Sequence, residues 1–443
     1  MILVTARRLL RSSLAATSLL ALAARGASAD RPRPRPLSIR EAVQLALQQN
    51  PQRLIAELAV RQSREDQTIA RAALLPQASV QAAQGVRSYN QQSITEAPHP
   101  VRVGPFQTIN AGPYASVTFS LTRLRQYQAS REDVQTATLQ ETTVREQVTA
   151  AVVTQYLLIL RATADREAAA ARVELAQRLY DQARQLQQAG VGTDIDALRA
   201  QVELQNEKQR LIDATTERST AIYALAQTLA LPRGEEPAPT DALEFYEVPE
   251  LSAERLTTQA FQNRPEIKSL LAAERAAASR VKAAGAQRLP DLQLSGFYAY
   301  QARQLDDGIG GYAYSFALSV PLWTGGQIGA EQQGARLERD RIEQSRRDAE
   351  NAVTRQVQTA LDQLSAARQS VEVAQLGLTL ARQEVERAGR RFEAGVATNI
   401  EVITAQSALA RADDNRIAAL YQFNQARADL ARSVGNAEDV YGH

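Results

Sequence analysis

The sequence A-G-V-G-T-D-I-D-A-L-R-A-Q occupies residues 189–201, and A-G-V-A-T-N-I-E-V-I-T-A-Q occupies residues 394–406. The two segments align without a gap at an offset of 205 residues (394 − 189). Their shared pattern is not typical of the interior of a helix, because the glycine favours a tight turn between two helices. The pair therefore predicts that the chain consists of two copies of one unit.

A second pair of landmarks supports the repeat. Pro51 and Pro76 align with Pro265 and Pro290 at a single offset of 214 residues (265 − 51 and 290 − 76). The Pro- and Glu-rich stretch between the copies reads as a linker. The predicted parts, in residue numbers, are a first repeat at 38–230, a linker at 231–251, a second repeat at 252–435 and a C-terminal tail at 436–443.

Each copy reads as a helix, a β-hairpin, a long helix and another helix. In the second copy, Tyr312, Tyr314, Phe316 and Leu318 alternate with small residues, which is the period of a strand. The hairpins are predicted at 76–121 and 290–322, with polar loops at 90–107 and 303–311. Strands with one apolar face suit either a barrel with lipid outside or a soluble hairpin packed on a helix.

The segments that follow the hairpins are long and helical. Residues 123–188 contain no proline or glycine, and residues 330–394 contain only scattered glycines. A helix of that length extends roughly 100 Å. Apolar residues recur at heptad spacing with alanine at the second seam position, which indicates close coiled-coil packing. The seam positions are Val357, Ala360, Leu364, Ala367, Val371, Ala374, Leu378, Ala381, Val385, Ala388 and Phe392, with Ala162, Ala169, Ala176 and Ala183 in the first copy.

The N-terminus has the features of an export signal. Arg7, Arg8 and Arg11 precede a short apolar run, and Ala27-Ser28-Ala29 provides small residues for cleavage before Asp30. Residues 1–29 are therefore predicted to be a signal peptide; a twin-arginine signal is the less favoured alternative. Residues 30–37 are predicted to be an extended, solvated arm.

The composition argues against several classes of function. The chain has no cysteine, and its 51 Lys and Arg against 49 Asp and Glu leave no basic excess for nucleic acid. Its two histidines, His99 and His443, belong to no metal or catalytic motif. We expect no enzyme activity, no cofactor and no metal site.

The strand count makes an oligomer necessary if the strands span a membrane. A spanning sheet must close, because unpaired strand edges cannot be left in lipid. Four strands per chain cannot close, and two chains would give about eight strands with a filled interior. Three chains would give twelve strands, the smallest number that leaves a tunnel.

These features together resemble the TolC-type outer membrane efflux proteins over nearly the whole mature chain. The segments that carry the resemblance are LSIREAVQLALQQNP (37–51), ARAALLPQ (70–77), QAGVGTDIDALRAQ (188–201), SFALSVPLWTGGQ (315–327) and RRFEAGVATNIEVITAQ (390–406). The resemblance implies a mainly α fold with a membrane β-barrel contribution. It also implies a homotrimer in the outer membrane, with a twelve-stranded barrel and an α-helical barrel in the periplasm. Its partners would be outer-membrane lipid, a periplasmic adaptor and an inner-membrane pump.

The same resemblance points to functional residues. The helical-hairpin tips that meet the adaptor would be Gly190, Val191, Gly192 and Thr193, and Gly395, Val396, Ala397 and Thr398; a tight turn alone also explains these glycines. The family's ring of paired aspartates at the periplasmic gate falls on Glu401 and Thr404, with Asp196 and Arg199 at the equivalent positions of the first copy. Glu401 is either a gate acid or an ordinary solvated residue. In the family, a basic side chain and a tyrosine hold the gate closed, and their positions correspond to Ala397 and Phe392 here. Neither residue can make the same contacts, so the resemblance predicts that the gate is held closed differently or more loosely.

The function expected from these residues is a passive exit duct for a tripartite efflux or type I secretion system. Efflux and secretion ducts share this fold, so the inner-membrane partner would distinguish them. The alternative from another class is a periplasmic coiled-coil scaffold or adaptor without membrane insertion.

Overall fold

The computed structural model describes most of the chain. The described residues are 33–90, 99–190, 192–249, 252–304, 306–394 and 396–442. The predicted signal peptide lies outside them. The chain divides into two compact units, each built from three stretches of sequence. Unit 1 contains the residues up to 48, 151–244 and 371–421, and unit 2 contains 49–150, 245–370 and 422 onward.

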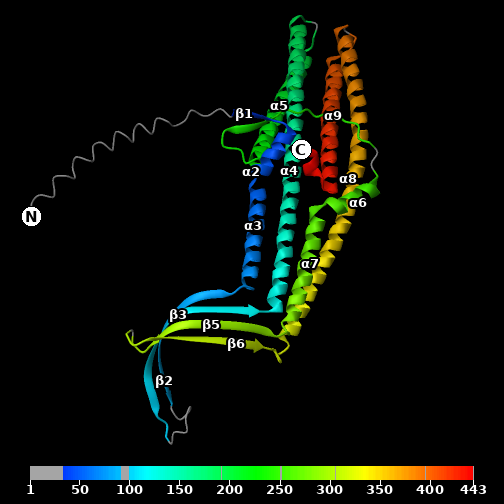
Figure 1. Ribbon diagram of the computed structural model, residues 1–443. Helices are drawn as coiled ribbons and strands as arrows, with labels where there is room; N and C mark the ends of the chain where they lie inside the picture. The colour runs from blue at the N-terminus through cyan, green and yellow to red at the C-terminus, as the bar shows by residue number, and fades with distance from the viewer. Residues whose placement is uncertain are drawn as a thin grey trace, which may run out of the picture. The chain divides into compact units, whose positions relative to one another are not determined.

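Unit 2 contains a four-stranded antiparallel sheet. Its strands are β2 (Gln77–Asn90), β3 (Arg102–Phe119), β5 (Asp291–Ala302) and β6 (Ile309–Ser319), in the order β2-β3-β5-β6 (Figure 1). The prediction of a loop over 90–107 is wrong for its last part. There β3 begins at Arg102, which pairs with Asn90, and Val103, Phe106 and Gln107 also pair with β2 in the antiparallel ladder.

The two hairpins lead into their long helices differently. After β3, Ser120 alone separates the strand from α4 (Leu121–Gln188), whereas residues 320–326 separate β6 from α8 (Gln327–Glu393). The first copy lacks the Pro and Gly-Gly of the second, and the difference in these connections follows from that. The 68 residues of α4 and the 67 of α8 agree with the predicted long helices.

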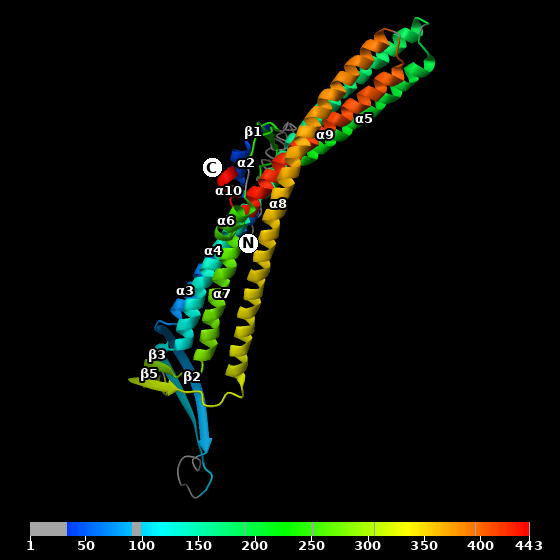
Figure 2. The ribbon, with the colours of Figure 1, turned by 90° about the vertical axis from the view of Figure 1, so that its right-hand side faces the viewer.

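Shorter helices lie beside the first parts of α4 and α8 in unit 2. They are α3 (Pro51–Ala72) and α7 (Pro265–Ala286), with α6 (Ala253–Asn263) and α10 (Ala437–Tyr441) completing the unit (Figures 1 and 2). Ala260, Ile267, Val353 and Val357 form a buried cluster that joins α6, α7 and α8. Across the described ranges, no helix is both long enough and apolar enough to cross a bilayer.

Unit 1 is a bundle of long helices. The later part of α4 and the whole of α5 (Asp194–Thr228) lie with the later part of α8 and most of α9 (Asn399–Val434) (Figure 2). The predicted alanine seam is confirmed, because Ala162, Ala169, Ala176 and Ala183 are only 2–3% exposed. The seam of α8 begins in unit 2 and continues in unit 1, and its buried positions are Val357, Ala360, Leu364, Ala367, Val371, Leu378, Ala381 and Ala388. Its other predicted positions, Ala374, Val385 and Phe392, are half-buried. Small side chains at these positions allow close helix packing.

The N-terminal arm is tied down inside unit 1. β1 (Arg33–Leu37) pairs in parallel with β4 (Glu235–Pro239), a strand within the predicted linker, and α2 (Ile39–Gln49) follows β1. The prediction of a solvated tether is therefore wrong for residues 33–37. Backbone hydrogen bonds to β4 order this Pro-rich segment, which sequence composition alone could not indicate.

Candidate functional site

Unit 1 contains two helix turns, short connections at which one long helix ends and the next begins, and the first of them joins α4 to α5. Gly190 has a φ of +74°, a left-handed conformation that favours glycine. Thr193 caps α5, since its Oγ1 accepts a hydrogen bond from the Asp196 backbone N–H at 3.3 Å. The Thr193 hydroxyl in turn donates to the Asp196 carboxylate. Of the predicted tip residues, Gly190, Gly192 and Thr193 thus form an ordered turn, and Val191 lies outside the described residues.

The second helix turn joins α8 to α9. The Val396 N–H donates to the Arg391 carbonyl at 3.0 Å, and the Glu401 N–H donates to the Thr398 carbonyl at 3.1 Å. The side chain of Val396 is 67% exposed, and Ala397 is half-buried. Gly395 lies outside the described residues. An exposed valine at a helix turn offers apolar surface to a partner.

Glu401 makes an ion pair that sequence reasoning missed. Its carboxylate lies 2.9 Å from Nε of Arg391, a residue in the last turn of α8. Both side chains are about half exposed, at 43% for Glu401 and 58% for Arg391. The basic pair Arg390-Arg391 opposite an acid in the first turn of α9 was the signal available in the sequence.

The other gate candidates have local roles. Thr404 is exposed, and its hydroxyl donates to the Ile400 carbonyl of its own helix at 2.8 Å. Asp196 is half-buried and bound to Thr193, as described above, while Arg199 is exposed. Unlike Thr404, Glu401 thus has a side-chain contact with another helix.

An apolar cluster holds the second turn in place. Leu179 of α4 packs with Ala388 of α8 and with Val402 and Ala405 of α9, and all four are buried. Phe392, expected at the position of a gate tie, packs against this cluster. Burial of these side chains stabilises the end of α8 against α4 and α9.

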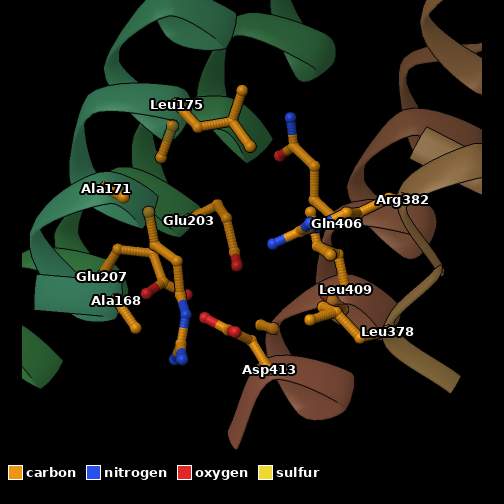
Figure 3. A pocket seen from close by; sticks show the side chains of 14 residues that line it. Ala168, Ala171, Leu175, Glu203, Glu207, Leu378, Arg382, Gln406, Leu409 and Asp413 are labelled. Carbon is orange, nitrogen blue, oxygen red and sulfur yellow. The ribbon is translucent and has the colours of Figure 1, made fainter. Parts of the chain in front are cut away.

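A cavity of about 160 Å³ lies between the four helices of unit 1, at some distance along α5 and α9 from their first turns. Figure 3 shows the carboxylates of Glu203, Glu207 and Asp413 around it, with Leu175 and Leu378 on its walls. The acidic side chains come from α5 and α9. Within the described part of the chain, no group of three or more His, Cys, Asp or Glu residues is placed to hold a metal ion.

Glu207 is the most buried acid of this cavity, at 4% exposure. Its Oε1 accepts from Arg210 at 2.6 Å, and its buried Oε2 has no hydrogen-bond partner among the described residues. Burial disfavours the charged carboxylate and raises the pKa of Glu207, and the nearby Arg210 opposes that shift. Close by, Arg172 of α4 pairs with Asp414 of α9. This network links α4 and α5 with α9 by charge as well as by packing.

Comparisons with known proteins agree with this architecture. The model of the family described as "Outer membrane efflux protein" matches residues 42–231 and 256–436. The CmeC outer membrane channel of Campylobacter jejuni has a similar structure, with a TM-score of 0.80 at 17% identity, covering 90% of this chain and 86% of that chain. At that identity the likeness shows the fold.

Two curated relatives are similar in sequence. Protein CyaE of Bordetella pertussis is 34% identical over 53% of this chain, and the pyoverdine export outer membrane protein OpmQ of Pseudomonas putida is 25% identical over 70%. The matches span 50% of CyaE and 64% of OpmQ.

The matched family covers most of the chain, and the fold is mainly helical with long helices and a four-stranded antiparallel sheet, as expected. The resemblance stated from the sequence is confirmed, because the matching family is that of the outer membrane efflux proteins. The chain belongs to the outer membrane efflux protein family.

Proposed function

We propose that this protein forms a homotrimeric channel that gives substrates of a tripartite efflux or type I secretion system a passive exit through the outer membrane. The observation that supports this proposal most directly is the four-stranded sheet of unit 2. It combines an exposed apolar face with outer strands that each pair on one side.

The apolar face runs across the sheet. On β6, Tyr312, Tyr314, Phe316 and Leu318 are 63–82% exposed. The register places Leu318 beside Leu292 of β5, which in turn lies beside Phe119 of β3. On the other face, Ser315 is paired with Ser295 and Ala317 with Gln293. An apolar face opposite a small, polar face suits lipid on one side and water on the other.

Within one chain the sheet is open, because its two outer strands do not pair with each other. β2 and β6 are its outer strands, with 14 and 11 residues, a length that can cross a bilayer when tilted. Their free edges would be costly in lipid, so closure with other copies is needed. Three copies give twelve strands and a tunnel, whereas two give about eight strands and a filled interior.

The helices of unit 1 carry exposed apolar stripes that a neighbouring copy could cover. Ile195, Leu198 and Val202 of α5 are 50–54% exposed and share one helix face. On α8, Val373, Leu376 and Leu380 form a similar stripe and are 56–72% exposed. In a homotrimer these stripes would pack against adjacent helices, which supports the α-barrel.

The two helix turns are the proposed contacts of a periplasmic adaptor, with an inner-membrane pump completing the assembly. The exposed Thr193 and Val396 support this proposal, because they combine a polar group with apolar surface at the helix ends. We also propose that 38–230 and 252–435 are structural repeats. Each contains two short helices, a hairpin, a long helix and a returning helix. The relative OpmQ is named for pyoverdine export, which supports an export role for this duct.

Native mass spectrometry of the full-length protein tests the assembly. Protein extracted in detergent from the outer-membrane fraction should give a trimer, because three four-stranded sheets close one barrel. A monomer or dimer recovered from the soluble periplasm would contradict the channel and favour the coiled-coil scaffold.

Glu401→Gln tests the proposed gate. In planar bilayers, this change should weaken block by divalent cations by about fivefold, or about 1 kcal/mol, because a trimer would lose a ring of three carboxylates. Arg391→Gln should strengthen the block, since it releases Glu401 from its ion pair. Single-channel conductance at stepped cation concentrations measures both changes.

Glu386→Gln is the matched control for the gate. Glu386 is an exposed acid on α8 that pairs with Arg390 at 3.0 Å. Its replacement should leave the block unchanged. If Glu401→Gln also leaves block and conductance unchanged, Glu401 is not part of the gate.

A further inference from the structure

Unit 2 contains a polar cavity of about 490 Å³ where α7 begins. Its walls come from the start of α7, the middle of α8 and the end of α9. Three arginines, Arg264, Arg355 and Arg432, line it, and Thr359 and Gln363 add further polar groups. The cavity is distinct from the helix turns and from the acidic cavity of unit 1.

Arg264 is buried and fixed in position. Its side chain is 8% exposed, and Nη1 donates to Gln356 at 2.6 Å. Nη2 and Nε donate to the Glu266 carboxylate at 2.6 and 3.4 Å. Gly435 packs on the Arg264 backbone so closely that a Cβ at residue 435 would lie 3.1 Å from its Cα and N. These contacts use three of the five guanidinium N–H groups and leave two for another acceptor.

The other two arginines provide charge at the mouth of the cavity. Arg355 and Arg432 are exposed, and neither side chain has an ion pair or hydrogen bond with any residue that the structure describes. The two acids of the lining are already engaged, because Glu266 holds Arg264 and Asp429 accepts from Gln425 at 3.1 Å. The lining therefore has three guanidinium groups and only two carboxylates, both already bonded, so the cavity has an excess of positive charge.

The start of α7 differs from its counterpart in the first copy. Asn50 caps α3, since its Oδ1 accepts from the N–H groups of Gln52 and Arg53 at 2.9 and 3.4 Å. At the offset of 214 residues, the second copy has Arg264 (50 + 214), which makes no side-chain cap. The first N–H groups of α7 thus lack the acceptor that the first copy provides. Such N–H groups, together with the helix dipole, favour an anion.

We propose that this cavity binds a small free anion, a carboxylate or a phosphate, through Arg264, Arg355 and Arg432. A planar guanidinium matches the paired oxygens of either group, and the anion completes the cap that Asn50 supplies in the first copy. The volume accommodates a di- or tricarboxylate. This proposal does not rest on the channel function.

Isothermal titration calorimetry on the full-length protein in detergent tests the site. Citrate and inorganic phosphate, titrated separately, represent the two sources of anionic oxygen. At least one should bind saturably, at one anion per chain, and more weakly as salt rises. The double variant Arg355→Gln/Arg432→Gln should bind at least about tenfold more weakly. The tighter of the two probes identifies the class of anion.

Two further variants make the result specific. Arg336→Gln removes an exposed arginine of α8 outside the cavity and should bind as the wild type does. Arg355→Lys/Arg432→Lys keeps the charge without the planar fork, so its affinity should be intermediate. Absence of saturable binding of both probes would overturn the proposal. So would wild-type affinity in the double glutamine variant, or an equal loss in Arg336→Gln.

Discussion

Replacing Tyr314 with arginine should prevent the protein from assembling in the outer membrane. Tyr314 lies in the middle of β6 and is 82% exposed on the apolar face, where lipid would contact it. An arginine on the lipid face near the bilayer midplane costs about 2–4 kcal/mol per chain, and three copies would enter one barrel. The expected loss of membrane-inserted trimer is therefore at least about 30-fold.

Fractionation of the cell envelope, followed by a trimer assay in detergent, measures this effect. Ala317→Arg is the matched control, because Ala317 lies three residues along the same strand on the opposite face, paired with Gln293. A water-facing arginine should be tolerated there. If Tyr314→Arg is inserted as well as the control, the apolar face does not contact lipid and the barrel proposal fails.

Tyr156→Phe should lower the free energy of unfolding by about 1–3 kcal/mol. Tyr156 is 0% exposed, and its hydroxyl joins α4 to β1 and the end of β4. The oxygen accepts from the N–H groups of Thr240 and Asp241 at 3.2 and 3.3 Å. The hydroxyl oxygen also lies 2.6 Å from Oδ2 of Asp241 and 2.9 Å from the Leu37 carbonyl oxygen, the two acceptors within reach of its hydrogen. Phenylalanine would remove these hydrogen bonds, although the Asp241 carboxylate keeps the Ile39 N–H at 2.8 Å and the Leu37 carbonyl keeps the Thr240 N–H at 3.1 Å.

Urea unfolding of the detergent-solubilised protein, followed by far-UV circular dichroism, measures the loss. Tyr223→Phe is the control, because Tyr223 lies on α5 in the same unit and is 61% exposed. Its replacement should shift the midpoint little. Equal midpoints for Tyr156→Phe and the wild type would show that the hydroxyl does not hold the arm and linker to α4.

Local patterns predicted most of the fold. The alternation around Tyr314 was enough for the strand, and the heptad alanines were enough for the buried seam, since both depend on residues near one another in the chain. The repeat also gave the order of the elements. The strand β3 was predicted to start too late because Gly104 and Pro105 favour a turn, and pairing with β2 overrides their local preference.

The candidate site was less accessible from the sequence. Glu401 could be identified by its place in the repeated A-G-V segment, but its partner Arg391 depends on how the end of α8 meets the start of α9. The arginines of the anion cavity are up to 168 residues apart (432 − 264), so no local motif links them. The hydroxyl of Tyr156 likewise meets Asp241, 85 residues away.

By itself, the sequence determined the period of each element, the two copies and the positions of the turns, because propensity and side-chain spacing act within a few residues. The tertiary structure decided which charges meet, which polar groups are buried, and that the N-terminal arm pairs with the linker. Those outcomes depend on contacts between residues that are distant in the sequence. The free energy of such a contact is set by tertiary packing, which removes water from both partners.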